Sequence, residues 1–439
     1  MTEHTDRRNV QVEAPNSSFP FKRWLLVELA ILTVYGLSFF SRFEWAVWLA
    51  VTVQALVLLL QWMQWLVMKR NLIMMPLFGH GQIDPLPPEQ WPSVTLVAGA
   101  RNEARGVERA VRSMAAQDYP CVRLVLVNDH STDGTTEIVQ RLEQQFPNLC
   151  VLHDPPEQPG WCGKQNAIWY GVQHIAWETE WLLFTDADVV FGPTVLRDAV
   201  AYADREQIDF LTCIPYIETD GVCQELLLVA GWHAFLYVPC YGTRKRPWKR
   251  SAGIGPFMLA RRKLYMELEG HKAVRHIPLE DAALGALFKK AGARLAVGRA
   301  GEQLLFHQYY GYSETFKALV LKQRRLANTK LAPVAMMSKH LITCVLPPVV
   351  AVGAVLKQVI NESVSAGFTL LAVLALLTYV QGIAKYRVAN AISSTRALSC
   401  YLVPLGGFLR MVTCGKAIWD DFVKTSNHWR GREIAKSEK

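Results

Sequence analysis

Residues 181–188 read Trp-Leu-Leu-Phe-Thr-Asp-Ala-Asp, so a short apolar run leads directly into two acids one residue apart. Such a run is typical of a buried strand in a parallel sheet. Carboxylates at the end of a strand can hold a divalent cation against a phosphate group. An ordinary strand-to-turn transition gives the same pattern, however, and Asp-x-Asp triplets are frequent by chance. The surrounding sequence has to distinguish these interpretations.

The surrounding region, from about Trp91 to His307, alternates short apolar runs with charged helical stretches. This alternation predicts an α/β fold with a mainly parallel sheet. The candidate strands are Val94 to Ala98, Val122 to Val127, Val151 to His153, Trp181 to Thr185 and Phe210 to Ile214. Ligands of open parallel sheets bind beyond the carboxyl ends of the strands, so residues that follow these runs should meet in one crevice.

Polar side chains follow the first two predicted strands. Arg101 and Glu103 come after the first, and Asp129, which could accept hydrogen bonds from a nucleobase or ribose, comes after the second. A turn and helix cap would also explain Asp129, because Asp-Gly and Ser/Thr clusters often begin helices. Three neighbours are better interpreted as cap residues: Ser131, Asp133 and Gly134.

Residues 160–164, Gly-Trp-Cys-Gly-Lys, precede a predicted helix from Gln165 to Ile175. A lysine at the start of a helix can meet phosphate oxygens, where exposed backbone N–H groups add to its charge. Lys164 is therefore a candidate phosphate ligand, although solvated lysines are common. The glycines match neither a P-loop nor a dinucleotide-binding fingerprint.

The two acids of residues 186–188 are candidates for different roles. Successive side chains of an extended segment point apart, so we expect Asp188 to bind Mg²⁺ or Mn²⁺ and Asp186 to contact the ribose or metal-bound water. A cation held there would neutralise a departing diphosphate.

Glu280 and Asp281 open a predicted helix that runs through Ala282 to Lys290. Acids stabilise helix N-termini whatever the chemistry, which is the structural explanation for both. Transfer to a hydroxyl requires a general base, for which Asp281 is the best candidate and His276 a weaker one. His271, His276 and His307 are individually expected to be structural.

The composition fits a water-soluble domain combined with membrane spans. The chain has 439 residues, of which 51% are hydrophobic, and a mean hydropathy of +0.11. The net charge is +9, and its densest cluster lies around Trp248, from Arg244 to Arg250. Beside membrane spans, such a cluster favours anionic lipid head groups over nucleic acid. Nine cysteines without a CxxC pair indicate reduced thiols.

Four segments approach the length of about 20 apolar residues that a bilayer crossing needs. Trp45 to Met68 and Ser363 to Ala384 contain no charge, whereas Trp24 to Phe40 carries Glu28 and Leu341 to Leu356 contains two prolines. Four of the flanking cations are Lys22, Arg23, Lys69 and Arg70. Together with Lys385 and Arg387, they place positive charge on one side of the membrane, so the central region is expected to face the cytoplasm. The expected location is a bacterial inner membrane. Ala397 to Leu409 is expected to be interfacial or re-entrant.

Two further features bear on an acceptor. Val222 to Cys240 is almost wholly apolar but contains Glu225 and Pro239, so it is either a core helix or a surface along which a lipid alcohol could approach Asp281. Gly253 and Gly255 would permit close backbone approach in an acceptor loop.

The motifs occur in an order that resembles family 2 glycosyltransferases. The matching residues are Arg101-Asn102-Glu103, Asn128-Asp129, Asp133-Gly134-Thr135, Lys164 with Ala167 and Gly171, Asp186-Ala187-Asp188, and Glu280-Asp281. Residues 160–164 and 271–284 look more narrowly like membrane enzymes of hopanoid, carotenoid and ceramide-type glycosylation. The resemblance covers the central half of the chain.

The resemblance implies a GT-A fold, a nucleotide-sugar donor, often UDP-linked, a divalent metal and inversion at the anomeric carbon. By analogy, Asp129 recognises the uridine part, Lys164 the nucleotide, Asp186 and Asp188 the diphosphate and metal, and Asp281 is the base. Arg101 and Glu103 accompany these motifs as candidates for binding the nucleotide sugar, and Glu280 as a candidate for contact with the acceptor or the diphosphate.

One departure from the family pattern weakens a chain-extending function. Processive and ceramide-type members carry Gln-x-x-Arg-Trp, whereas residues 323–327 read Gln-Arg-Arg-Leu-Ala. Arg324 or Arg325 could still contact the diphosphate or a lipid head group. We expect single transfers to a membrane lipid such as a polyprenoid, hopanoid or carotenoid. A polysaccharide synthase and a non-catalytic membrane-anchored nucleotide-binding scaffold are the alternatives.

The expected organisation has six parts. They are a cytosolic tail (1–23), a transmembrane hairpin (24–70), a GT-A domain (91–310), interfacial helices (311–340), a second hairpin (341–385), and an interfacial segment with a cytosolic tail (386–439).

Overall fold

A computed structural model describes residues 21–40, 43–232, 236, 251–326, 332–423, 428–429 and 432–433. The chain divides into two compact units. The first comprises Met74–Glu218 and Val238–Gln308, and the second comprises Asn16–Ile73, Thr219–Tyr237 and Tyr309–Lys439. The basic cluster predicted around Trp248 lies outside the described residues.

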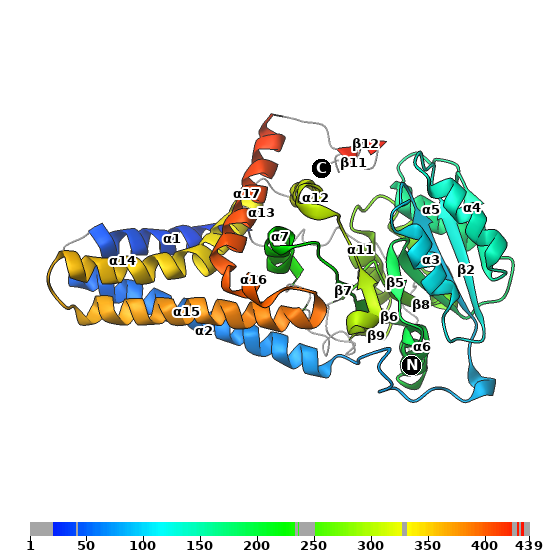
Figure 1. The fold of residues 1–439 in the computed structure, drawn as a ribbon, viewed down its shortest axis with the longest axis horizontal. Helices are drawn as coiled ribbons and strands as arrows, with labels where there is room; N and C mark the ends of the chain where they lie inside the picture. The colour runs from blue at the N-terminus through cyan, green and yellow to red at the C-terminus, as the bar shows by residue number, and fades with distance from the viewer. Residues whose placement is uncertain are drawn as a thin grey trace, which may run out of the picture. The chain divides into compact units, whose positions relative to one another are not determined.

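The first unit is built on a seven-stranded sheet in the order β3-β2-β1-β4-β8-β6-β9 (Figure 1). All five predicted strands are present: β1 (Val94–Ala100), β2 (Val122–Asn128), β3 (Leu149–His153), β4 (Trp181–Asp186) and β6 (Phe210–Ile214). The first four are mutually parallel, with β1 between β2 and β4. Their carboxyl ends therefore share one edge of the sheet, as predicted.

Two strands of the main sheet and a second, smaller sheet were not predicted. β8 (Met258–Arg261) is antiparallel to both β4 and β6, and β9 (Leu295–Arg299) pairs with β6 in parallel. The smaller sheet has the order β5 (Val189–Phe191), β10 (Leu304–Phe306) and β7 (Tyr216–Ile217). These strands are only two to five residues long, which leaves little periodicity to detect.

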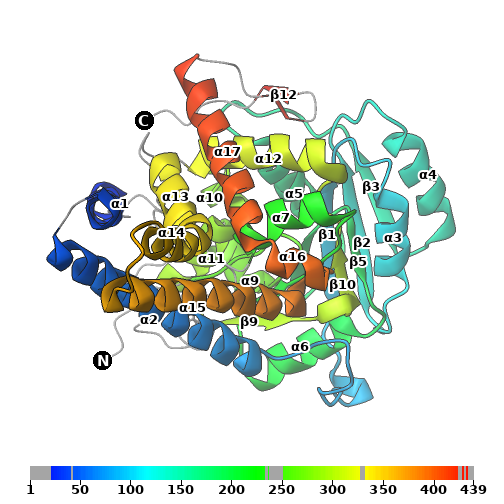
Figure 2. The same cartoon turned by 60° about the vertical axis from the view of Figure 1, so that its left-hand side comes forward.

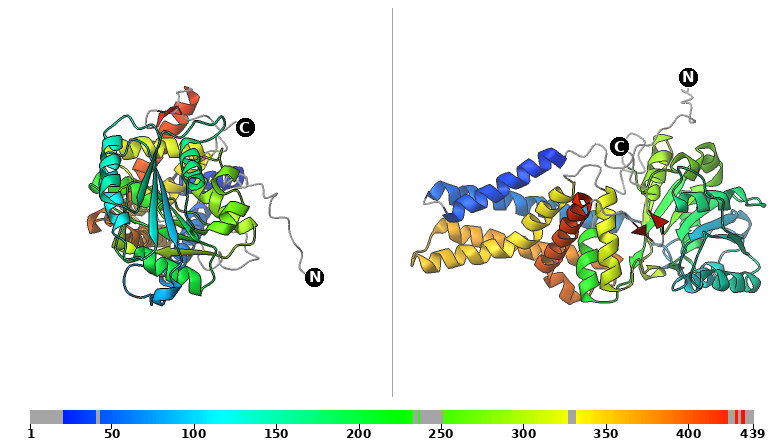
Figure 3. Two further views of the ribbon diagram at one scale, coloured as in Figure 1. Left: turned by 90° about the vertical axis from the view of Figure 1, so that its right-hand side faces the viewer. Right: turned by 90° about the horizontal axis from the view of Figure 1, so that it is seen from above.

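Helices cover both faces of the main sheet (Figure 3). One face packs against α5 (Gly163–Gln173), α9 (Arg262–Glu267), α10 (Gly270–Ala273) and α11 (Glu280–Lys290), through a core that includes Phe184, Phe210 and Phe288. α3 (Val107–Ala115) and α4 (Thr135–Gln145) lie on the opposite face, and α6 (Val195–Arg205) contacts β6. Two short 3₁₀ turns complete the unit, η2 (Pro88–Gln90) and η4 (Gly301–Gln303).

The second unit is helical and contains the predicted apolar segments. α1 (Phe21–Phe40) and α2 (Glu44–Met74) follow one another in the chain, and the Tyr35 hydroxyl of α1 donates a hydrogen bond to Gln54 of α2. α14 (Leu346–Ile360) and α15 (Ala366–Ala389) run side by side (Figure 2). α13 (Ala332–His340) continues into α14 through a π-helical turn, η5 (Leu341–Val345). Three described helical stretches are long and apolar enough to cross a membrane: Glu44–Met74, Ala332–Ile360 and Ala366–Ile392.

The fourth predicted span is a helix with a shorter apolar part, Leu25–Phe40. Its charged residue, Glu28, is buried within the second unit and interacts with Ser338 and Lys339 of α13. Many large apolar side chains of α2 and α15 are instead exposed, including Leu59, Leu60, Leu376 and Leu377. Such an exposed apolar surface is what a lipid environment would cover.

The other helices in the described part of the second unit are α7 (Val222–Trp232), α12 (Gly311–Leu326), η6 (Asn390–Ile392), α16 (Ala397–Tyr401) and α17 (Val403–Phe422). The predicted interfacial piece from Ala397 to Leu409 is thus two helices, and the second is longer than the apolar pattern indicated. α17 begins at a proline-containing first turn, where Pro404 needs no backbone donor. A two-stranded hairpin, β11 (His428–Trp429) and β12 (Arg432–Glu433), follows.

α7 is a core helix of the second unit, one of the two alternatives for the segment from Val222. Leu226, Leu227 and Leu228 are buried, and the Glu225 side chain is 1% exposed. The Glu225 carboxylate accepts hydrogen bonds from the Ser399 hydroxyl and, at 3.0 Å, from the Arg396 backbone N–H. Residues 233–235 and 237–240 of the predicted segment lie outside the described residues.

Candidate active site

Lys164 connects two of the predicted acidic motifs. Its Nζ atom lies 2.5 Å from Oδ1 of Asp186 at the end of β4 and 2.7 Å from Oε1 of Glu280 at the start of α11. Although burial alone would lower it, these two carboxylates hold the pKa of the Lys164 ammonium well above its usual value. Motifs far apart in sequence therefore meet at one site, as the sheet topology predicts.

The position of Lys164 follows from the way α5 packs on the sheet. α5 begins at Gly163, two residues before its predicted start, so Lys164 lies in the first helical turn. Gly171 permits this packing, because a Cβ atom there would lie 2.9 Å from a methyl group of Val127 on β2. The close contact between α5 and β2 therefore determines where Lys164 lies relative to the carboxyl ends of the strands.

The glycines of the loop before β8 complete the cluster. The backbone N–H of Gly255 donates to Oδ2 of Asp281 at 3.1 Å. A Cβ atom at Gly255 would lie 3.3 Å from Oδ2 of Asp186 and 3.5 Å from Nζ of Lys164. At Gly253, a Cβ atom would collide with the backbone oxygen of Asp281. These glycines were predicted to permit close approach, and the group that approaches them is the start of α11.

Asp281 has a defined orientation beside this loop. Besides the bond from Gly255, its Oδ1 atom accepts the backbone N–H of Ala282 at 2.7 Å. These two backbone donors hold the carboxylate beside the loop that contains Gly255, in the first turn of α11. Glu280, by contrast, is buried and faces Lys164.

Asp188 lies in a turn between β4 and β5, which differs from the extended segment assumed in the sequence analysis. Its Oδ1 atom is buried and has no hydrogen-bond partner among the described residues. Burial, reinforced by the nearby charge of Asp186, raises the pKa of Asp188 to about 8. A buried carboxylate oxygen without a partner is suited to a cation, and oxygen donors match Mg²⁺ and Mn²⁺.

The described residues contain no group of three or more His, Cys, Asp or Glu side chains placed to hold a metal ion. A divalent cation at Asp188 would therefore need further ligands beyond the His, Cys, Asp and Glu side chains of the described residues. Phosphate oxygens and water are the ligands that Mg²⁺ usually takes in addition to one or two carboxylates. The residues present thus fit a cation that is bound together with a diphosphate.

Asp129 directly follows β2, and the Arg101 side chain reaches it from the end of β1. The Arg101 guanidinium donates to the backbone oxygen of Asp129 at 3.0 Å and lies 3.8 Å from its carboxylate. His130, to which the sequence analysis gave no role, places Nδ1 3.0 Å from Oδ1 of Asp129. Its adjacency to Asp129 was the only sequence signal for this contact.

Of the three residues interpreted as cap residues, Gly134 is the N-cap of α4, but this helix has no side-chain cap hydrogen bond, so Ser131 and Asp133 have another role. Ser131 accepts the backbone N–H of Asn102, and Asp133 accepts those of Ala104 and Thr135. Although partial burial opposes it, hydrogen bonds led by that with Thr135 lower the pKa of Asp133. Glu103 donates its backbone N–H to Thr135 at 2.9 Å. The loops after β1 and β2 are thereby joined.

His271 is a structural residue of this unit. It is fully buried, its Nδ1 atom lies 2.9 Å from the Tyr265 hydroxyl, and its ring packs edge-on against Phe184. Burial, together with the positive charge of Lys164, lowers its pKa to about 3.

Arg324 and Arg325 belong to α12 in the second unit. Nε of Arg324 donates to Asp421 of α17 at 2.8 Å, and its side chain is 3% exposed. The side chain of Arg325 lies outside the described residues. Their predicted contact with a diphosphate or lipid stays a prediction.

Comparison with known families identifies the chain. Residues 92–325 match the model of the family described as "Glycosyltransferase like family 2". The chain belongs to this family. The match contains every acid of the cluster around Lys164, and it confirms the predicted family and the GT-A class of the α/β unit.

Individual relatives are similar over parts of the chain. The 4,4'-diaponeurosporenoate glycosyltransferase of Staphylococcus haemolyticus is 26% identical over 52% of this chain and 59% of the relative. The beta-monoglucosyldiacylglycerol synthase of Synechocystis is 35% identical over 18% of this chain and 16% of the relative. The chain thus spans less than two thirds of the length of either.

Among solved structures, the chain is similar to the mannosyltransferase PcManGT from Pyrobaculum calidifontis, solved with GDP-Man and Mn²⁺. The TM-score is 0.45 at 16% identity, with 90% of this chain and 99% of the other covered.

Proposed function

We propose that this family 2 protein is an inverting glycosyltransferase that moves a sugar from a nucleotide sugar, UDP-linked as the family resemblance implies, to a membrane lipid. The observation that carries the proposal is the contact of Lys164 with both Asp186 and Glu280. It gathers acids from two distant motifs beside Asp281, so that donor and base groups share one site.

The donor is held by the ends of β1, β2 and β4. Asp129, supported by Arg101, accepts hydrogen bonds from the base or ribose, with Glu103 on the same side. Lys164 neutralises diphosphate oxygens, which replace a carboxylate as its partner when the donor binds. Asp186 would contact the ribose, or water held by the cation when it is bound.

Asp188 would hold the divalent cation. Its buried Oδ1 atom without a hydrogen-bond partner supports this role. When bound, Mg²⁺ or Mn²⁺ would supply positive charge where negative charge develops on the departing diphosphate. Lys164 supplies a second positive charge to the same leaving group.

Asp281 acts as the general base. Its carboxylate is oriented by the backbone N–H groups of Gly255 and Ala282 and takes the proton of the acceptor hydroxyl. The hydroxyl oxygen forms the new bond to the anomeric carbon as the bond from that carbon to the diphosphate oxygen breaks. Attack from the face opposite the diphosphate inverts the anomeric configuration, and the nucleoside diphosphate leaves.

A membrane lipid acceptor is supported by the long apolar helices of the second unit. The two relatives reported above are named for a carotenoid-type acid and for a glucosylated diacylglycerol, which are lipids. We therefore propose a polyprenoid, hopanoid or carotenoid-like acceptor. The six-part organisation, including a GT-A domain over 91–310, and a bacterial inner membrane location with that domain in the cytoplasm belong to the same proposal.

The test uses the detergent-solubilised full chain with a panel of nucleotide sugars and a membrane lipid extract, with and without Mn²⁺. Mass spectrometry should detect a glycosylated lipid that forms with one donor and requires the cation. Comparison of lipids from cells that lack or overproduce the protein identifies the acceptor. A polymer product would support a polysaccharide synthase instead, and donor binding without any product would support a scaffold.

A further inference from the structure

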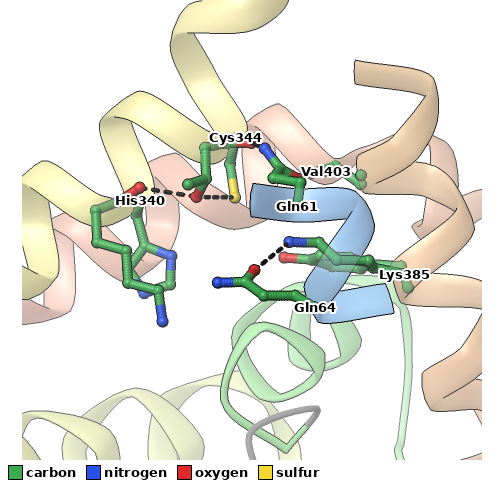
Figure 4. Close-up of a pocket in the computed structure, with 10 residues that line it drawn as sticks. Gln61, Gln64, His340, Cys344, Lys385 and Val403 are labelled. Atoms are coloured by element: carbon green, nitrogen blue, oxygen red, sulfur yellow. Dashed lines mark hydrogen bonds between the residues drawn. The ribbon is translucent and has the colours of Figure 1, made fainter. Parts of the chain in front are cut away.

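The second unit contains a small cavity lined by residues of α2, α13, η5, α15 and α17 (Figure 4). Its volume of about 20 Å³ accommodates a water molecule but no larger ligand. In Figure 4, Gln64 and Lys385 point toward one another, and Nζ of Lys385 donates to Oε1 of Gln64 at 3.3 Å. This contact fixes the spacing of the two helices at that level.

Toward their C-terminal ends, the same helices border a larger groove of about 340 Å³. α2 and α15 run in the same direction, because Gln54 bonds to Thr378 near their middles and Gln64 to Lys385 farther along both. The groove is lined by Trp65, Lys69, Leu72, Ala384, Arg387, Val388 and Ala391.

The charge of this groove is wholly positive among the described residues that line it. Lys69 and Arg387 are exposed, come from opposite helices, and have no ion-pair partner among the described residues. Aromatic rings position both: Nζ of Lys69 lies 5.4 Å from the centre of the Trp65 ring, and the Arg387 guanidinium lies 5.6 Å from that of Tyr401. Arg387 also donates to the Tyr401 hydroxyl at 3.1 Å.

The walls between these cations are apolar, and the preceding turns of both helices expose leucines such as Leu60 and Leu377. The groove therefore begins where the apolar surface ends. At this level of a membrane helix, basic and aromatic side chains meet lipid head groups, and basic pockets between helices bind anionic ones.

We propose that this groove is a binding site for an anionic glycerophospholipid. The lipid phosphate lies between Lys69 and Arg387, and an acyl chain follows the apolar wall past Trp65 and Ala384. The site is separate from the proposed transfer reaction, because none of its residues belongs to the acid cluster around Lys164. It binds a lipid that the protein retains and does not glycosylate.

The experiment is native mass spectrometry of the full chain in detergent, titrated separately with phosphatidylglycerol and phosphatidylcholine. The parent should retain phosphatidylglycerol preferentially. In the double variant Lys69→Gln with Arg387→Gln, its dissociation constant should rise at least about tenfold, since each basic residue near a membrane surface attracts anionic lipid. Ala384→Phe, which fills the wall and leaves both charges, should weaken binding of the same lipid.

Arg70→Gln is the matched control, because Arg70 is the neighbouring cation of α2 and does not line the groove. This variant should bind phosphatidylglycerol as the parent does. Equal retention of both lipids, or unchanged phosphatidylglycerol binding in the double variant, would overturn the proposal. Displacement of the lipid by millimolar inorganic phosphate would likewise overturn it, by showing a site for the free anion. Glycosylation of the retained lipid would show that it is the acceptor.

Discussion

Nζ of Lys164 in α5 lies 2.7 Å from Oε1 of Glu280 in α11, and the same atom lies 2.5 Å from Asp186 of β4. One cation therefore balances two carboxylates that would otherwise repel each other. The negative charge of the site remains in excess, since Asp281 approaches the same loop through Gly255. We propose that this excess attracts a divalent cation and that Lys164 meets the diphosphate that accompanies the cation.

Lys164→Met should weaken both the first unit and donor binding. The partly buried Lys164 side chain screens two acids from each other, so its loss should cost about 1 to 2 kcal/mol of stability. Lys164→Arg, which keeps the charge, should recover part of each. Thermal unfolding and calorimetric nucleotide titration measure the two effects. Lys263→Met, at an exposed lysine, is the control and should match the parent in stability and nucleotide affinity. A Lys164→Met protein that binds the nucleotide with the parent's affinity would exclude Lys164 as a donor ligand.

Asp281→Asn should keep donor affinity and lose transfer. The amide oxygen can still accept the Gly255 N–H, but the amide cannot take the acceptor proton, so kcat should fall by about 10²- to 10⁴-fold. Steady-state kinetics and calorimetric donor titration separate the two quantities. Asp84→Asn, at a carboxylate that is 95% exposed, serves as the control. Parental turnover in Asp281→Asn would remove Asp281 from the role of base.

Asp188→Ala should abolish the dependence of donor binding on metal. In the parent, Mn²⁺ should tighten UDP binding, because Asp188 provides a buried oxygen without a hydrogen-bond partner. In the variant, calorimetry should give the same weak affinity with and without Mn²⁺. The interpretation fails if the parent itself binds UDP equally well in the absence of the metal.

The sequence was most informative where apolar runs end in polar residues. β1, β2 and β4 were recognisable because each is a mostly apolar run, and parallel topology then places Asp129, Asp186 and the neighbouring loops at one edge. The start of α11 was recognisable from the acids in its first turn. Both features can be seen in the local sequence: the alternation of strands and helices indicates parallel strands, and acids in a first turn indicate the start of a helix.

Other features depend on contacts that local sequence does not encode. The loop before the antiparallel strand β8 places Gly255 beside Asp281. A strand of four residues is too short to be recognised from the alternation of apolar and polar residues. An extended segment was expected at Asp188, but the chain turns there because it leaves the main sheet after β4 and enters the smaller sheet, where β5 pairs with β10. The contact of Lys164 with Glu280 required the packing of α5 and α11 on the same face.

His271 should make the stability of the first unit sensitive to acid. Its pKa is about 3 in the folded protein, against about 6.5 in an unfolded chain, so below pH 6.5 the unfolded state binds a proton that the folded state excludes. Stability should therefore fall as pH decreases from 6.5, by up to about 2 to 3 kcal/mol at pH 4.5.

His271→Asn should reduce this acid sensitivity, because the amide oxygen can accept the Tyr265 hydroxyl without titrating. Thermal unfolding of the full chain between pH 7 and pH 4.5 measures the difference from the parent. His276→Asn, at an exposed histidine, should leave the pH profile unchanged. An identical profile for the parent and His271→Asn would contradict the buried neutral state of His271.

The central claim is that the acids of β4 and α11 surround a single site for nucleotide and metal. A crystal structure of the full chain with UDP and Mn²⁺, with anomalous data at the manganese edge, tests it most directly. The account predicts a manganese peak that bridges a carboxylate oxygen of Asp188 and the UDP diphosphate, with Lys164 beside the phosphates. A manganese peak away from Asp188, or UDP bound away from Lys164, would contradict it.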